Sequence, residues 1–466
     1  MTILEALEDV NLLAPAFRPA ASWVAWRVFL AAVFGLSLEA DGLTRYRQHT
    51  GRAVPPASPA REAWVIVGRR GGKSRIAALL AVYAAAFKRY DLALGERGVV
   101  MVLAADRRQA RVVFRYVCGL VDACPMLAAL VADRTAEALR LTNGIDIEIH
   151  TASFRAVRGY TLVAAILDEV AYWPTDDSAN PDTETVAALR PGMASVPGAL
   201  LVGISSPYAR RGELWRAYEH HYGIDGDPVL VWQADTRSMN PAVEASIIST
   251  AYEDDEARAA AEYGAQFRRD VERFVSREAL TACIVPDRQE LPRSAEREHL
   301  AFVDPSGGSA DSFTLAIAHR EDDRVVLDLL REWRPPFSPD EVVREYAALV
   351  RSYGAAVVYG DRYAGEWPRE RFRAHEVSYV TADKSKSELY QAFLPLLNAG
   401  RVELLDQRRL TTQLLGLERR TARSGRDSID HGPGAHDDIA NAVAGATVLA
   451  AEIQEIPLEW WREVLA

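Results

Sequence analysis

The chain has 466 residues, 49% of them hydrophobic, and a formal net charge of −11 at pH 7. This length predicts two domains, and the composition excludes an intrinsically disordered chain. The acidic balance argues against a nucleic-acid partner, but binding depends on local patches. Residues 407–426 hold six arginines and one acid, a local charge of +5 that is typical either of a nucleic-acid contact or of a solvated helix face.

No part of the chain has the character of a targeting or membrane segment. The first residues are acidic where a signal peptide would be basic, and the longest apolar runs are about a dozen residues, too short to span a bilayer. The three cysteines, Cys118, Cys124 and Cys283, show no metal-ligand spacing. We therefore expect a soluble cytosolic protein with reduced thiols, neither secreted nor held in a membrane.

In the first half of the chain, apolar strands alternate with helices. The expected strands are residues 63–67, 99–104, 145–150, 162–167 and 200–204, and the expected helices are 20–40, 73–90 and 108–121. This order predicts an α/β domain over residues 1–283, with a largely parallel sheet between two layers of helices.

The pattern starts again after a polar, proline-containing stretch, residues 284–298, which we interpret as a linker. Strands are expected at 299–304, 313–319 and 324–330, followed by a helix at 338–352, a strand at 355–361 and a last helix at 437–453. Three antiparallel strands followed by alternating helices and strands are the order of a ribonuclease-H-like α/β fold. We therefore predict a second domain over residues 299–466, including a C-terminal tail.

A glycine-rich loop follows the first strand of the α/β domain. Residues 67–74 read Val-Gly-Arg-Arg-Gly-Gly-Lys-Ser, which matches a phosphate-binding loop except that Val67 stands where the first glycine is usual. A loop between a strand and a helix points backbone N–H groups at a phosphate, and its lysine and serine reach the β- and γ-phosphates and Mg²⁺. The expected ATP-binding residues of this P-loop NTPase domain are Gly68, Arg69, Arg70, Gly71, Gly72, Lys73 and Ser74.

An acidic pair, Asp168 and Glu169, ends the apolar run 162–167. A carboxylate at the end of a strand beside the loop is expected to hold the Mg²⁺ of the nucleotide, which is the role of Asp168. Glu169 is expected to orient the attacking water, which favours hydrolysis over transfer to a substrate. Ser205 and Ser206, at the end of the next strand, are expected either to sense the γ-phosphate or to form a turn before Pro207.

Hydrolysis also needs a cation near the charge that develops on the γ-phosphate. Arg69 and Arg70 lie within the loop and are candidates in the same subunit, whereas Arg158 is a candidate that reaches a neighbouring subunit's nucleotide. For each arginine, a surface or structural role remains an alternative.

Carboxylates also end strands in the second half. Asp304 and Asp361 each close an expected strand, and Asp437 and Asp438 open the last helix. Clustered carboxylates repel one another unless metal ions neutralise them, so we expect two Mg²⁺ or Mn²⁺ ions that cut a phosphodiester by activating water. Adjacent helix residues do not share a face, so Asp437 and Asp438 are not expected to contribute equally. Asp311 and Lys386 are weaker candidates, for an outer ligand and a phosphate contact.

Taken together, these motifs resemble the large terminase subunit of tailed double-stranded DNA phages, over roughly residues 15–450. The segments that carry the resemblance are the loop 68–74, the triplet 167–169, the serines with Pro207, the segment 263–267, Gly360 with Asp361, and residues 436–442. In that family the loop often lacks its first glycine and carries an arginine soon after. Here two arginines stand in the loop, so the resemblance does not decide which arginine is catalytic.

The resemblance implies a motor that hydrolyses ATP to move double-stranded DNA into a procapsid, joined to a nuclease that cuts concatemeric DNA. It further implies a portal protein and a small terminase subunit as partners, a homo-oligomer (a pentamer) when docked, and a place in the host cytoplasm or on the procapsid. An alternative is a DNA repair or recombination ATPase-nuclease, although no helicase motif accompanies the nucleotide site. A non-catalytic assembly protein has no use for clustered aspartates, and a small-molecule kinase leaves the second half unexplained.

Overall fold

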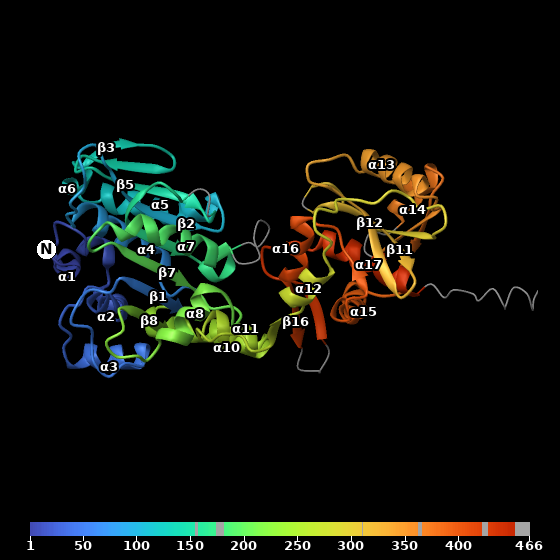
Figure 1. Cartoon of the computed structure of the whole chain (residues 1–466). Helices are drawn as coiled ribbons and strands as arrows, with labels where there is room; N and C mark the ends of the chain where they lie inside the picture. Colours follow the sequence, from blue (N-terminus) through green and yellow to red (C-terminus); the bar gives the residue numbers. More distant parts are fainter. Residues whose placement is uncertain (154–156, 174–180, 310, 362–365, 422–426, 453–466) are drawn as a thin grey trace, which may run out of the picture. The chain divides into compact units, whose positions relative to one another are not determined.

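The computed structural model describes residues 1–153, 157–173, 181–309, 311–361, 366–421 and 427–452, drawn in colour in Figure 1. The chain divides into two compact units, one within residues 1–270 and one that starts at Val271. Among the described helices, none is long and apolar enough to cross a bilayer.

The first unit contains an eight-stranded sheet in the order β3-β4-β5-β2-β6-β7-β1-β8. Six strands run parallel: β1 (Glu62–Val67), β2 (Gly98–Ala104), β5 (Ile145–Thr151), β6 (Thr161–Asp168), β7 (Leu200–Ser205) and β8 (Val229–Ala234). The short strands β3 (Val131–Arg134) and β4 (Ala138–Leu141) extend one edge in antiparallel fashion. The predicted α/β fold with a largely parallel sheet is therefore confirmed.

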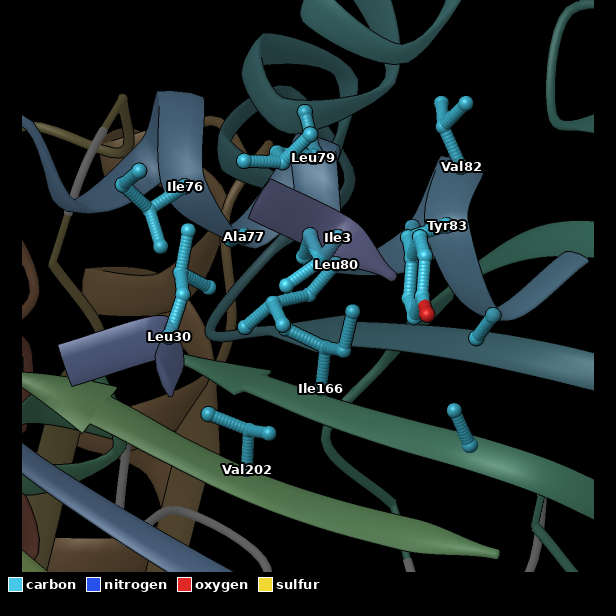
Figure 2. Packing of buried hydrophobic residues seen from close by; sticks show 14 of the residues in the cluster. Ile3, Leu30, Ile76, Ala77, Leu79, Leu80, Val82, Tyr83, Ile166 and Val202 are labelled. Atoms are coloured by element: carbon cyan, nitrogen blue, oxygen red, sulfur yellow. The ribbon is translucent and has the colours of Figure 1, made fainter. Parts of the chain in front are cut away.

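Helices cover both faces of this sheet (Figure 1). One face carries α1 (Ile3–Glu8), α2 (Val24–Val33), α4 (Lys73–Ala86) and α5 (Arg107–Asp122), and the other carries α7 (Pro181–Ala194) and α8 (Gly212–His221). Figure 2 shows Leu30, Ile76 and Leu80 on the helix side of the core and Ile166 and Val202 on the strand side. Because α4 lies between the sheet and other helices, it is apolar on nearly all sides.

The helix predicted over residues 20–40 is shorter in the structure. A 3₁₀ turn (Ala20–Trp23) leads into α2, which ends at Val33, and α3 (Ala40–Thr50) follows as a separate helix. The break falls at Gly35, whose φ is +63° and where a Cβ would lie 2.6 Å from the carbonyl carbon of Ser58. Sequence periodicity missed this break because it depends on a contact with a distant segment.

The second unit contains a six-stranded sheet in the order β14-β13-β10-β11-β12-β15. Its strands are β10 (His299–Asp304), β11 (Phe313–Glu321), β12 (Arg324–Trp333), β13 (Val357–Gly360), β14 (Ser378–Thr381) and β15 (Val402–Glu403). The first three pair in antiparallel fashion and the others add in parallel. This is the ribonuclease-H-like arrangement that the sequence predicts.

The helix α13 (Pro339–Ser352) packs on one face of this sheet. The helices α15 (Lys386–Asn398), α16 (Arg408–Gly416) and α17 (Asp438–Glu452) pack on the other. Gly445 lets α17 approach β10 closely, because a Cβ there would lie 2.3 Å from the ring of Phe302. This close approach brings the start of α17 to the end of β10, where Asp304 lies.

The boundary between the units differs from the predicted one. Residues 271–298 belong to the second unit, because β9 (Val271–Arg273) pairs with β16 (Leu417–Thr421) and α12 (Arg277–Cys283) packs on α15. The stretch 284–298 has the composition of a linker, yet its backbone bonds to the unit: the N–H of Val285 donates to the Leu404 carbonyl, and that of Leu291 to the Asp328 carbonyl. Composition does not reveal such pairing.

Candidate active sites

The glycine-rich loop connects β1 to α4, and distant side chains hold its carbonyl groups. Trp26 Nε1 donates to the Gly71 carbonyl over 2.7 Å, Thr236 Oγ1 to that of Arg69 over 2.8 Å, and Asn240 Nδ2 to that of Arg70 over 2.8 Å. The first N–H groups of α4 have no partner within the helix and remain available for a phosphate. Sequence reasoning missed all three donors.

The position of glycine in the loop follows from its surroundings. A Cβ at Gly68 would lie 2.3 Å from Thr236 Oγ1 and 2.6 Å from the carbonyl oxygen of Tyr263, so only glycine fits there. Val67, by contrast, is a fully buried member of β1. The glycine that appears one place late in the motif therefore stands where the chain packs closest against residues 236 and 263.

Lys73 is buried at the first position of α4, with Ser74 next to it. Its ammonium donates to the Val67 carbonyl over 3.0 Å and to Ser206 Oγ over 2.8 Å, and lies 3.3 Å from Glu169 Oε1. The Lys73 ammonium therefore joins the loop to Glu169 and Ser206, which are far from it in the sequence.

Asp168 lies at the end of β6 and is 2% exposed. Its Oδ1 is buried and has no hydrogen-bond partner within the described residues. Burial, followed by the charge of Glu169, raises the pKa of Asp168 to about 7, against the opposing effect of Lys73. An unsatisfied carboxylate oxygen at this place fits a ligand of Mg²⁺.

Glu169 turns out of β6 with a positive φ of 49° and meets the end of β7. Its Oε2 accepts from Ser205 Oγ over 3.2 Å and from the Ser206 N–H over 3.1 Å. The predicted serines therefore contact the glutamate expected to orient water.

The three candidate arginines lie in different surroundings. Arg69 is 59% exposed and pairs with Glu262 over 3.3 Å, and Arg70 is exposed with a φ of +63°. Arg158 is exposed on the turn before β6, at the opposite end of that strand from Asp168. A strand of this length spans about 25 Å at roughly 3.3 Å per residue, so Arg158 does not reach the nucleotide site of its own subunit.

An apolar pocket of about 300 Å³ adjoins the phosphate loop. Its lining includes Phe17, Trp23 and Trp26 from the N-terminal segment and Ile76 from α4. The guanidinium of Arg75 lies 5.2 Å from the rings of both Phe17 and Trp23. Sequence reasoning assigned no ligand to these aromatic residues, although both tryptophans stand in the helix predicted before the loop.

In the second unit, one pocket brings the predicted acidic residues together. Asp304, Asp361, Asp437 and Asp438 all line it. Because β10 and β13 are parallel neighbours, their carboxyl ends place Asp304 and Asp361 at one edge of the sheet, and the start of α17 supplies the other two. Trp367, Asn441 and Lys386 also line this pocket.

Simultaneous ionisation of the aspartates in this pocket is unfavourable. Burial, followed by the charges of Asp361, Asp438 and Asp437, raises the pKa of Asp304 well above its usual value, while a hydrogen bond from Asn441 Nδ2, 3.0 Å long, acts in the opposite direction. Burial and then Asp437 raise the pKa of Asp438 to about 6. Bound divalent cations would relieve this repulsion.

The two adjacent aspartates have different contacts. Asp437 is 5% exposed, accepts from the Tyr390 hydroxyl over 2.9 Å and pairs with Lys386 over 3.0 Å. Asp438 Oδ2 accepts only a longer bond, 3.3 Å, from the Ser312 N–H among the bonds of the described residues. Lys386 also pairs with Asp430 over 2.7 Å, and Asp311 is exposed and lies 3.5 Å from His436 Nδ1.

We expect metal binding to depend on pH near the pKa of Asp438. Because that pKa is raised to about 6, the carboxyl group binds a proton below this pH, and a metal ion must then displace it. Mn²⁺ affinity measured by calorimetry should therefore fall as the pH is lowered through 6. An affinity that stays constant across this range would contradict the assignment of Asp438 as a ligand.

The arginine-rich segment 407–426 is largely paired within the second unit. Arg409 pairs with Glu332 over 2.8 Å, Arg419 with Asp427 over 3.4 Å and Arg420 with Glu418 over 3.2 Å. Arg423 and Arg426 lie outside the described residues. Arg409, Arg419 and Arg420 therefore do not form a free basic patch for nucleic acid, because carboxylates of the same unit already pair with them.

No family model and no curated protein matches the sequence. Among solved structures, the chain is similar to the HK97 bacteriophage large terminase, with 18% identity and a TM-score of 0.38, covering 84% of this chain and 91% of that one. The large terminase of a thermophilic bacteriophage, solved in complex with ADP, is 13% identical at a TM-score of 0.38, covering 85% and 96%.

The large terminase nuclease of the thermophilic phage G20c with bound magnesium is 19% identical at a TM-score of 0.32, covering 36% of this chain and 94% of that one. All three are phage large terminases, the family that the sequence resembles.

Proposed function

We propose that the first unit hydrolyses ATP and that the second cuts DNA with divalent metal ions, as the parts of a tailed-phage DNA-packaging enzyme. The observation that carries this proposal is that each unit gathers its own catalytic set. Lys73, Asp168 and Glu169 meet at the phosphate loop, and four aspartates line one pocket of the second unit.

In the first unit, the residues divide the work of hydrolysis. The loop N–H groups and Lys73 bind the β- and γ-phosphates, with Lys73 exchanging its contacts to Val67 and Ser206 for phosphate oxygens. Ser74 and Asp168 would hold Mg²⁺, which would neutralise phosphate charge. Glu169 orients the attacking water, and its bonds to Ser205 and Ser206 couple the γ-phosphate to the end of β7.

In the second unit, Asp304, Asp361 and Asp438 would hold two Mg²⁺ or Mn²⁺ ions, and such ions would supply water activation and charge stabilisation for phosphodiester cleavage. Asp437 contributes less, because Lys386 and Tyr390 already engage its carboxylate. Lys386 positions Asp437 through its contact with that carboxylate.

The finer assignment rests on the resemblance in the sequence. We propose that the chain moves double-stranded DNA into a procapsid and cuts concatemers, docks as a pentamer on a portal protein, and receives DNA from a small terminase subunit in the host cytoplasm. The alternative of a repair or recombination ATPase-nuclease predicts the same two chemistries without packaging.

The test uses the purified full-length chain. ATP hydrolysis is measured with and without double-stranded DNA, and plasmid cleavage is measured with Mn²⁺ and with chelator. Both activities are expected, and loss of either from the intact chain would refute the two-site proposal. Packaging of DNA into procapsids that carry the portal then separates the packaging enzyme from the repair alternative, which would cleave DNA without packaging it.

The aromatic pocket beside the loop is proposed to hold the adenine base. Trp23→Ala should raise the KM for ATP about 10-fold with a smaller change in kcat, because stacking of a base on an aromatic ring is worth about 1–3 kcal/mol. Tyr116→Ala, an exposed aromatic residue on α5, is the matched control. An unchanged KM in the Trp23 variant would place the base elsewhere.

Arg158 is proposed to act on the nucleotide of a neighbouring subunit. Arg158→Ala alone should lower kcat by about 10³-fold or more, the effect of losing an arginine finger. Mixed with Lys73→Ala subunits, which retain Arg158, the activity should recover above both inputs. A mixture with the Lys73→Ala/Arg158→Ala double variant is the control, and absence of recovery would return the role to Arg69 or Arg70.

A further inference from the structure

A second group of potential metal ligands lies in the sheet of the second unit, apart from the aspartate pocket. His299, His319 and Asp328 come from β10, β11 and β12 and are 4%, 7% and 0% exposed. One ligand atom from each lies within 4.8 Å of the other two. None of them lines the pocket that holds Asp304.

The sheet brings these three side chains to one face. His299 and His319 are direct partners in the antiparallel pair of β10 and β11. The pairing of β11 with β12 shifts between Ile317 and Ala318, so that Ile317 faces Leu329 and Ala318 faces Leu327. Asp328 is the extra residue of this bulge, and the bulge turns its carboxylate toward the histidines.

His319 and Asp328 are hydrogen-bonded to each other, and the ligand atoms of the cluster lie close to the spacing that a shared ion would require. His319 Nδ1 lies 2.8 Å from both oxygens of Asp328, and His299 Nε2 lies 3.7 Å from Asp328 Oδ2. Ligands at about 2.0–2.1 Å from a tetrahedral Zn²⁺ are roughly 3.3 Å from one another, so small side-chain movements suffice.

The surroundings enclose the cluster. The ring of Tyr353 lies 5.4 Å from that of His299, and the Tyr353 hydroxyl donates to the carbonyl of Leu291. The N–H of Leu291 donates to the Asp328 carbonyl over 2.8 Å. Among the described residues, His299 Nε2, the nitrogen nearest Asp328, accepts only a long hydrogen bond of 3.5 Å, from the Ser294 N–H, and a metal ion would replace it. Nδ1, on the other side of the ring, is buried and makes no well-formed hydrogen bond within the described residues.

The ligand chemistry separates this cluster from the aspartate pocket. Two imidazoles and one carboxylate suit Zn²⁺ and similar transition-metal ions, whereas oxygen-only sets suit Mg²⁺ and Mn²⁺. The second oxygen of Asp328 or a water completes the coordination. Such an ion would join three neighbouring strands, one of which carries Asp304 at its other end.

We propose that His299, His319 and Asp328 bind one structural transition-metal ion of the Zn²⁺ type. The full-length chain, stripped with chelator and dialysed against Zn²⁺ in excess Mg²⁺, should retain one zinc per chain by elemental analysis. Co²⁺ in its place should show the intense visible bands of a four-coordinate site with nitrogen ligands. A wild-type chain that retains no zinc, or shows only the weak bands of octahedral Co²⁺, would overturn the proposal and leave a hydrogen-bonded His–Asp pair.

Variants locate the ion. His319→Gln and the isosteric Asp328→Asn should each weaken zinc binding at least about 10-fold. The exposed His220→Gln and the aspartate-pocket variant Asp361→Asn should retain the zinc. Zinc lost from Asp361→Asn but kept by His319→Gln would place the ion in the acidic pocket and refute the assignment. Circular dichroism checks folding, and the wild-type Co²⁺ spectrum decides the question if a variant does not fold.

Discussion

Lys73→Ala should abolish ATP hydrolysis, with kcat lowered at least about 10²-fold, and leave Mn²⁺-dependent DNA cleavage by the same chain unchanged. A preorganised cation that meets the charge developing on a phosphate is worth about 3–4 kcal/mol or more. The ammonium of Lys73 is the group on which the Val67 carbonyl, Ser206 and Glu169 converge. Phosphate release measures the first activity and plasmid nicking the second.

The matched control for this experiment is Lys88→Ala. Lys88 donates to the Gly198 carbonyl and lines a pocket with the starts of β1 and β7, at the opposite edge of the sheet from the phosphate loop. Its replacement should leave hydrolysis within a few-fold of the wild type. Equal loss of hydrolysis and cleavage in the Lys73 variant would refute two independent sites, provided that its melting temperature shows a folded chain.

Asp438→Asn should remove Mn²⁺-dependent DNA cleavage and keep ATP hydrolysis. Asparagine retains the volume and the bond from the Ser312 N–H but not the charge that holds a cation, so the loss should reach about 10²-fold or more. Asp361→Ala should have the same effect, because Asp361 lines the same pocket from the end of β13. Cleavage of supercoiled plasmid is the measurement.

Two comparisons make the Asp438 result specific. Asp437→Asn should lose less activity than Asp438→Asn, because Lys386 and Tyr390 already bind the Asp437 carboxylate. Asp340→Asn, whose side chain pairs with Arg371 over 3.2 Å on the surface, should cleave normally. Retained cleavage in Asp438→Asn would remove this residue from the metal ligands, and a larger loss in Asp437→Asn would reverse the order of the pair.

Much of both sites follows from local sequence. A strand that runs into a glycine-rich loop and a helix predicts a phosphate site, and the apolar run before Asp168 predicts a carboxylate at the end of a second strand. In the second half, the placement of Asp304 and Asp361 at strand ends predicts a shared metal site, and one pocket contains both because β10 and β13 are parallel neighbours. These inferences depend on where each strand begins and ends along the chain, and the alternation of apolar and polar segments in the sequence reveals this.

The partners of these residues depend on contacts between distant segments. Trp26 and Asn240 hold the loop carbonyls from positions 45 and 170 residues away along the chain. Asn441 meets Asp304 because Gly445 lets α17 approach β10. No periodicity in one segment carries this information, because each contact requires the sheet and its helices to be packed first.

The sequence by itself determined two α/β units, the phosphate loop with its acidic pair, and the four aspartates of the second site. Only the tertiary structure decided that Asp437 and Asp438 have different partners and that residues 271–298 join the second unit. It also brought Asp328 beside two histidines through a bulge. The reason is physical: strand and helix patterns are local, whereas burial, pairing register and charge neighbours are properties of the packed chain.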